Sequence, residues 1–151
     1  MNTVMSTNIR KLAGFVKALE KIGFNFNVRL FNNRLKLQKF VFLAKQYGID
    51  LGYNFNLYIR GPYSPLLAED YYRLSEEIEP IRVELPDDFL RLIKNKSERW
   101  LELASTVVMV KNRYPSIDDE KIIKIVLGNK PFTNEKELKK IICKLRKHKA
   151  I

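Results

Sequence analysis

The segment Arg34–Tyr47 reads RLKLQKFVFLAKQY and includes five consecutive apolar residues, FVFLA, at positions 40–44. Five apolar residues in a row cover more than one face of a helix, and a helix that is apolar nearly all round is usually buried. Asn32 or Asn33 can start this helix, and Gly48 can end it. The sequence therefore predicts a central helix over residues 34–47, around which the rest of the domain packs.

Two other segments alternate between apolar and polar residues, as β-strands with one wetter face do. In residues 53–60, Tyr53, Phe55, Leu57 and Ile59 fall on one face and Asn54, Asn56 and Tyr58 on the other. The Gly61-Pro62 pair is expected to end this strand. Ile81, Val83 and Leu85 alternate with charged residues. We therefore expect two short strands, near residues 53–60 and 79–85, which pair as a small ribbon connected by a helix.

Capping residues mark the remaining helices. Ser6 or Thr7 can start a helix that runs to about Ile22, and Ser64 followed by Pro65 is a strong start signal. Further starts are expected near Asp88, at Ser97, at Ser116 with Asp119 as a capping box, and at Thr133. The fold class predicted is α+β, predominantly α-helical, with about six helices and a small two-stranded β element. Residues 1–151 are expected to form a single domain.

The chain carries 28 Lys and Arg against 17 Asp and Glu, a formal net charge of +11. The charge is uneven: residues 1–60 carry a net +8, residues 61–110 a net −4 and residues 111–151 a net +7. Excess positive charge favours contact with phosphates, although a lysine-rich surface also aids solubility. If both basic ends form one continuous face, nucleic acid is favoured; a dominant apolar or tyrosine-rich patch favours a protein partner.

Most catalytic classes lack the residues they need. One Cys (Cys143) and one His (His148) exclude a disulfide framework, a Cys-rich zinc site and most hydrolytic triads. No P-loop or dinucleotide-binding glycine pattern occurs. We therefore expect no enzyme, no cofactor and no metal. The apolar runs are too short for a transmembrane helix and residues 1–11 lack a signal-peptide core, so a cytoplasmic protein without membrane contact is expected.

The basic helical hairpin at residues 116–149 is one candidate binding surface. Its last helix has an apolar stripe and an opposite lysine face made of Lys136, Lys139, Lys140, Lys144 and Lys147. Two helices joined by about five residues have the size of a helix-turn-helix. Glu135 and Glu137 at the start of the second helix would repel phosphates, although they also complement the helix dipole. A solvated face on a packed hairpin is the alternative to nucleic-acid binding.

The second candidate is the strand-to-helix segment that begins at Arg60. Its candidate partner-binding residues are Tyr58, Arg60, Gly61, Pro62, Tyr63 and Ser64. Free N–H groups at a helix start can hold an anion or a partner's carboxylate, although turn chemistry alone also accounts for these residues. Aromatic residues gather in the same region, namely Tyr47, Tyr53, Phe55, Tyr58, Tyr63, Tyr71 and Tyr72. Exposed tyrosines favour protein interfaces, whereas rings interleaved with Arg and Lys can also stack on bases.

Two segments together resemble a known family. Residues 35–44 (LKLQKFVFLA) are similar to the KLQK-hydrophobic helix of the Panacea (SocA-type) antitoxin domains and of the related YwgA-type proteins. Residues 53–70 resemble the family's stretch around a Gly-Pro pair followed by an aromatic residue and Ser, with Arg60 where Tyr or His is more usual. The family-like part covers about residues 8–75.

This resemblance implies a compact, mostly helical domain with a small β element. It also implies a binding module without catalytic residues, which neutralises a toxin or adapts one for a chaperone or protease. Together with the composition, it leads us to expect a non-enzymatic, antitoxin-like regulatory module that contacts a protein partner. The alternative is a nucleic-acid-binding regulator that uses the basic C-terminal hairpin.

Overall fold

The computed structural model describes residues 7–151 and contains, in that part of the chain, seven α-helices and one two-stranded antiparallel sheet. The predominantly helical α+β class is therefore confirmed, with one helix more than the six expected. The helices are α1 Thr7–Leu19, α2 Phe31–Ala44, α3 Pro65–Tyr72, α4 Asp87–Ile93, α5 Glu98–Arg113, α6 Asp119–Asn129 and α7 Glu135–Lys147. Short 3₁₀ turns, η1 Glu20–Ile22 and η2 Lys45–Tyr47, extend α1 and α2.

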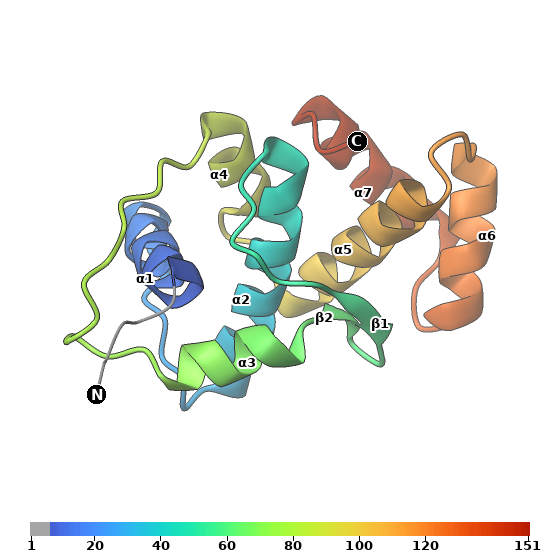
Figure 1. Cartoon of the computed structure of the whole chain (residues 1–151). Helices are drawn as coiled ribbons and strands as arrows, with labels where there is room; N and C mark the ends of the chain where they lie inside the picture. Colours follow the sequence, from blue (N-terminus) through green and yellow to red (C-terminus); the bar gives the residue numbers. More distant parts are fainter. Residues whose placement is uncertain (1–6) are drawn as a thin grey trace.

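Helix α2 lies in the middle of the molecule, as its apolar run predicts, and shares that place with α5 (Figure 1). Nine residues of each helix are buried. Helix α1 lies at one end of the molecule and α6 at the other (Figure 1). No helix in residues 7–151 is long and apolar enough to cross a bilayer.

The sheet is a hairpin of two adjacent segments, β1 Asn56–Tyr58 and β2 Gly61–Tyr63, with Ile59 and Arg60 as its turn. Its register pairs Leu57 with Pro62. The prediction that Gly61-Pro62 ends the strand is therefore wrong, because these residues form the second strand. The predicted apolar face is also wrong at its end: Leu57 and Ile59 are exposed, Ile59 by 89%.

Residues 79–85 are extended but do not form the predicted second strand. Their backbone is bound by a helix: the Ile81 N–H donates to the Arg10 carbonyl of α1 at 3.0 Å, and Arg10 Nε donates to the Glu79 carbonyl at 3.1 Å. The segment lies so close to α1 that a Cβ at Gly14 would be 1.7 Å from the Ile81 carbonyl oxygen. The alternating pattern therefore reflects extended backbone, which occurs both in a β-strand and in this strap, residues 79–85, across α1.

Several helix ends follow the predicted chemistry. Ser97 Oγ accepts the Trp100 N–H, and Ser64 Oγ accepts the Leu67 N–H with Pro65 at the first helical position. Gly23 and Gly48 adopt the left-handed conformation that ends α1–η1 and α2–η2. The Ser6 alternative for the first cap lies outside the described residues.

Other caps are shifted. Asp118, not Ser116, caps α6, because residues 114–117 form a turn before the helix begins. Asn134, not Thr133, caps α7, and the Thr133 hydroxyl bonds Glu137 instead. Helix α2 begins at Phe31 without a side-chain cap.

Candidate functional site

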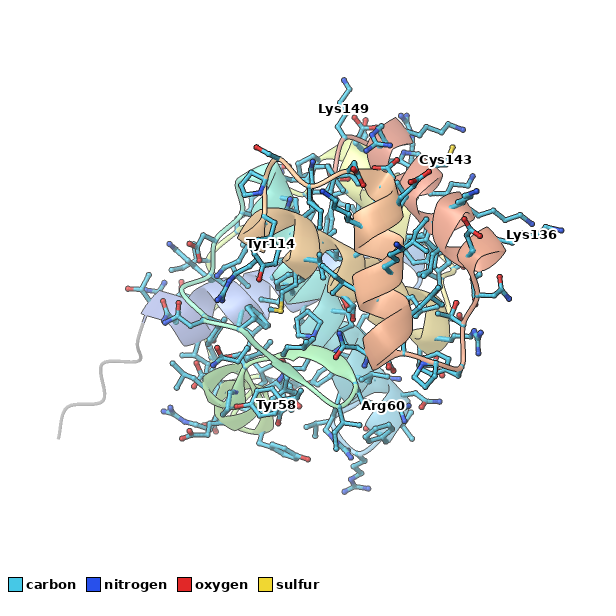
Figure 2. The ribbon with its side chains drawn as sticks, turned by 90° about the vertical axis from the view of Figure 1, so that its right-hand side faces the viewer. Tyr58, Arg60, Tyr114, Lys136, Cys143 and Lys149 are labelled. Atoms are coloured by element: carbon cyan, nitrogen blue, oxygen red, sulfur yellow. The ribbon has the colours of Figure 1, made fainter. Side chains whose placement is uncertain are left out.

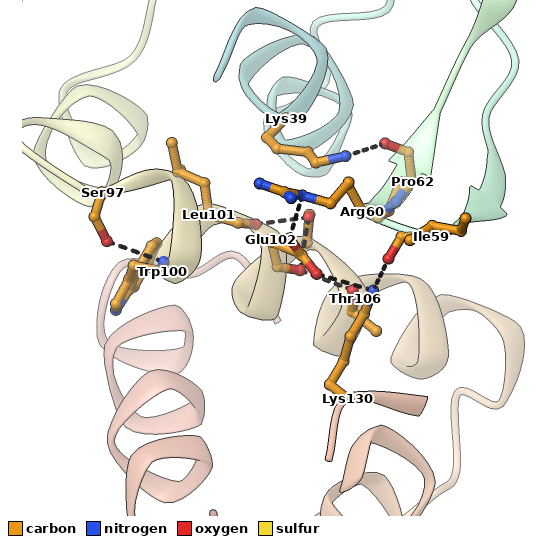
Figure 3. Close-up of polar contacts among 11 residues, drawn as sticks. Lys39, Ile59, Arg60, Pro62, Ser97, Trp100, Leu101, Glu102, Thr106 and Lys130 are labelled. Carbon is orange, nitrogen blue, oxygen red and sulfur yellow. Dashed lines mark hydrogen bonds and ion pairs between the residues drawn. The ribbon is translucent and has the colours of Figure 1, made fainter. Parts of the chain in front are cut away.

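A buried ionic cluster fixes the hairpin turn to the helical body (Figure 3). The Glu102 carboxylate on α5 lies 3.0 Å from Lys130 Nζ and 3.2 Å from Arg60 Nε. Lys130 follows α6 directly and also donates to the Ile59 carbonyl at the turn. Because Glu102 and Lys130 are both buried, their charges are stable there only as partners. The cluster therefore holds Arg60 in one place while leaving half of its side chain exposed.

The inner strand of the hairpin is bound by side chains of α2. Lys39 Nζ donates to the Pro62 carbonyl at 2.6 Å. The Gln38 amide exchanges two hydrogen bonds with the Ser64 backbone, both at 2.9 Å. These side chains therefore satisfy the edge of β2 that β1 does not cover.

Lys39 is completely buried beneath the hairpin. Burial lowers its pKa, the charge of Glu102 raises it, and the charges of Lys130 and Arg60 lower it, so that the pKa falls from 10.5 to about 7. Gly61 lies beside Lys39 with a φ of +94°, and a Cβ there would lie 3.2 Å from Thr106 Oγ1. A larger residue with this φ would be strained.

A pocket of about 350 Å³ opens between the start of α2, the hairpin and α3. Its walls include five aromatic rings, those of Phe31, Tyr58, Tyr63, Tyr71 and Tyr72. The rings brace one another at an angle: Tyr58 and Tyr63 are T-shaped with centroids 5.3 Å apart, and Tyr71 is tilted against Tyr72 at 5.4 Å. Burial raises the pKa of Tyr71 to about 12, so this hydroxyl is uncharged near neutral pH.

Three cationic side chains, Arg34, Lys39 and Arg60, also line this pocket, and no carboxylate is among its described lining residues. The Arg34 guanidinium lies 5.8 Å from the centroid of the Phe31 ring, and that of Arg60 lies 5.5 Å from the same centroid. Both are within the range of cation–π contacts. The pocket is therefore apolar in its walls and positive in its charge.

Four of the six predicted partner-binding residues, Tyr58, Arg60, Gly61 and Tyr63, line this pocket. Pro62 and Ser64 lie behind them and bind α2 through their backbones. The free N–H groups expected at the start of α3 are partly used, because Ser64 itself accepts the Leu67 N–H.

Sequence reasoning missed the contributions of Lys39 and Arg34 from α2. Lys39 sits in the middle of a helix that was expected to be buried, so a buried cation was a readable signal there. The pairing of Glu102 with Lys130 has no local signal, because the two residues are far apart in the sequence.

The lysine face of α7 lies on another part of the molecule than the aromatic pocket. Lys136, Lys139, Lys140, Lys144 and Lys147 are all exposed, as predicted. In Figure 2, Cys143 and Lys136 mark α7 at the upper right of the molecule, and Tyr58 and Arg60 lie in its lower part. Helix α1 lies apart from α7, so the exposed lysines of these two helices do not share one face (Figure 1).

The two carboxylates at the start of α7 are engaged within the fold. Glu137 forms a bidentate pair with Arg99 at 2.7 and 3.0 Å, and hydrogen bonds from Arg99 and Thr133 lower its pKa to about 2. Glu135 lies 3.3 Å from Lys139. The repulsion that these carboxylates would exert on phosphates is therefore smaller than the sequence alone suggests.

No three His, Cys, Asp or Glu side chains in residues 7–151 gather closely enough to hold a metal ion. In comparisons with known proteins, no family model, curated protein or solved structure matches this chain.

Proposed function

We propose that this chain is a non-enzymatic, antitoxin-like regulatory module that contacts a protein partner through the aromatic pocket and its rim. The observation that carries the proposal is the exposure of large apolar side chains around this pocket. Seven such residues come from the start of α2, the hairpin and α3, namely Leu30, Phe31, Leu57, Tyr58, Ile59, Leu66 and Tyr72. We call these seven residues the aromatic patch.

Four residues of the aromatic patch, Phe31, Tyr58, Ile59 and Tyr72, also line the pocket, so the patch is continuous there. Elsewhere in residues 7–151 the exposed large apolar residues are Tyr114, Ile125 and Phe132. Apolar patches around a concave centre are typical of protein interfaces, where tyrosine and arginine contribute much of the binding energy. The resemblance of residues 8–75 to antitoxin domains supports the same class of function.

The proposal is tested by capturing partners of the tagged full chain from its native host, with and without nuclease. The informative variant is Ile59→Asp, because a side chain that is 89% exposed can change without loss of packing. The matched control is Ile125→Asp on the exposed face of α6. We expect one protein recovered in stoichiometric amount, resistant to nuclease, lost with Ile59→Asp and retained with Ile125→Asp. If the partner protein is still recovered with Ile59→Asp, or if no partner is recovered at all, the proposal is contradicted.

The second candidate, nucleic-acid binding, is favoured by the exposed lysine face of α7. Its test is the affinity for mixed-sequence duplex DNA at low and raised salt. Removing two phosphate contacts with Lys140→Gln and Lys144→Gln should flatten the salt dependence by about two units of log–log slope. The double variant Lys17→Gln and Lys21→Gln on α1 and η1 makes the same change of net charge at a distant site. Equal effects of both double variants, or no binding at low salt, would exclude a specific role of α7.

A further inference from the structure

The aromatic pocket carries more positive charge than its contacts within the chain neutralise. Of its two arginines, only Arg60 has an ion pair among residues 7–151, and the carboxylate involved, Glu102, also pairs with Lys130. The hydrogen bond of Lys39 is to a carbonyl, as is that of Arg34, whose Nη1 donates to Val28 at 2.7 Å. This excess of cations over carboxylates indicates an anionic ligand.

The guanidiniums of Arg34 and Arg60 have N–H donors with which to bind an anionic ligand. A guanidinium has five N–H donors in a planar fork that matches a carboxylate. Arg60 uses its Nε toward Glu102, and Arg34 uses one Nη, so most donors of both groups have no partner among the described residues. Both guanidiniums lie within 6 Å of the Phe31 centroid, so they flank the same wall of the pocket.

The size and walls of the pocket restrict the chemical group that can bind there together with the anion. A volume of about 350 Å³ is at the small end for ligand sites and has room for about one large side chain. Five aromatic rings line the pocket, which favours an apolar or aromatic group. The ring pairs Tyr58–Tyr63 and Tyr71–Tyr72 meet at 72° and 51°, so neither is the parallel sandwich that would hold a nucleobase between two rings.

We propose that the aromatic pocket recognises the C-terminal residue of the partner protein, with its large apolar side chain against the tyrosine wall and its α-carboxylate on Arg34 and Arg60. This inference rests on the proposed protein-binding function and specifies the chemistry of the partner. A chain end fits better than an internal segment, because one residue then supplies both the apolar group and the carboxylate to a pocket of one-residue size. A chain end can also enter a pocket through one opening, whereas an internal segment has to enter and leave it.

The probe is a pentapeptide, GSGSF, with an acetylated N-terminus and a free C-terminal carboxylate, titrated calorimetrically into the full chain. Its control is the same peptide with a C-terminal amide, which keeps the ring and removes the charge. A third peptide, acetyl-GSDFGS-amide, offers a side-chain carboxylate beside an internal phenylalanine. We expect the free acid to bind about tenfold more tightly than either other peptide, since hydrogen bonds to a charged group are the stronger ones.

The variants Arg34→Gln and Arg60→Lys should each weaken binding of the free acid toward the affinity of the amide. Arg60→Lys keeps a positive charge beside Glu102, so the buried cluster stays neutralised while the planar fork is lost. Arg91→Gln, on the exposed surface of α4, should leave the affinity unchanged.

Equal affinities for the acid and the amide, or no binding of the free acid, would overturn the C-terminal assignment. Tighter binding of the internal-acid peptide would also overturn it and would assign the cations to a side-chain carboxylate. These failures leave the proposed function standing if the Ile59-dependent partner is still captured. Loss of that capture as well would contradict both the C-terminal assignment and the proposed function.

Discussion

The Glu102 carboxylate and the Lys130 ammonium form a buried ion pair at 3.0 Å that connects three separate parts of the fold. Glu102 belongs to α5, Lys130 follows α6, and Lys130 also bonds the Ile59 carbonyl at the hairpin turn. The same carboxylate contacts Arg60, which lines the aromatic pocket. Glu102 therefore connects the hairpin arginine to α5 and to the end of α6, beside the contacts that Lys39 and Gln38 of α2 make with the hairpin.

Replacing this carboxylate should destabilise the protein strongly. With Glu102→Gln, we expect the free energy of unfolding to fall by about 3–5 kcal/mol, because the buried Lys130 ammonium loses its carboxylate partner. The control is Glu98→Gln on the same helix, whose contact with Lys36 at 3.4 Å is partly exposed, and which should change stability by less than about 1 kcal/mol. Urea denaturation measures both; equal losses would contradict a special role for Glu102.

Lys39 should make stability depend on pH above neutrality. Burial lowers its pKa to about 7 in the folded chain, against 10.5 for an exposed lysine. Between about pH 7 and 10.5, the unfolded chain therefore binds more protons, and the contribution of this residue to stability rises with pH. Below about pH 7 both states are protonated, and the cost of burying the charge is fully present.

The variant Lys39→Met isolates this contribution. Denaturation at about pH 6, 8 and 10 should show a wild-type chain that gains stability relative to Lys39→Met as the pH rises. Lys17→Met, which removes an exposed lysine of α1, should run parallel to the wild type over the same range. A difference between wild type and Lys39→Met that does not change with pH would contradict the lowered pKa.

Two helical glycines should respond oppositely to alanine. A Cβ at Gly14 would collide with the Ile81 carbonyl at 1.7 Å, so Gly14→Ala should lower stability by about 2 kcal/mol or more despite its better helix propensity. Gly128 in α6 has open space around it, so Gly128→Ala should raise stability by up to about 1 kcal/mol. Thermal unfolding of both variants provides the measurement. A stabilised Gly14→Ala would show that the strap at residues 79–85 does not hold this place.

The Tyr53 hydroxyl should contribute to stability through its hydrogen bond to the Asp70 carboxylate. It donates to Asp70 Oδ2 at 2.6 Å in a buried position, and burial together with this hydrogen bond raises the pKa of Tyr53. Tyr53→Phe should therefore cost about 1–3 kcal/mol, since Asp70 loses a buried partner. Tyr114→Phe, at a half-exposed ring, should have no measurable effect in the same denaturation experiment. An equally small effect at Tyr53 would mean that Arg73, 3.7 Å from Asp70, suffices.

The helical part of the fold was predictable because helix signals are local. The apolar run at residues 40–44, the Ser64-Pro65 and Ser97 caps, and the Gly23 and Gly48 ends all act within one or two turns of the chain. The first strand was predicted at residues 53–60, which contain β1, whereas the second was placed at residues 79–85 and lies at Gly61–Tyr63. Alternation at residues 81–85 marks an extended chain, and nothing in it tells whether the neighbour is a strand or helix α1.

The candidate site was partly predictable for a similar reason. Tyr58, Arg60, Gly61 and Tyr63 are close in sequence and reach the pocket together through one hairpin. Arg34 and Lys39 come from α2, and their approach to Arg60 depends on how α2 packs against the hairpin.

By itself the sequence determined a mainly helical domain with a buried second helix, an excess of positive charge and too few His and Cys residues for most catalytic sites, because composition and short-range periodicity carry this information. Only the tertiary structure decided that three cations gather on one aromatic pocket and that Glu102 and Lys130 meet in the interior. The physical reason is that burial and ion pairing between residues distant in sequence depend on the packing of whole helices, and no local pattern encodes that packing.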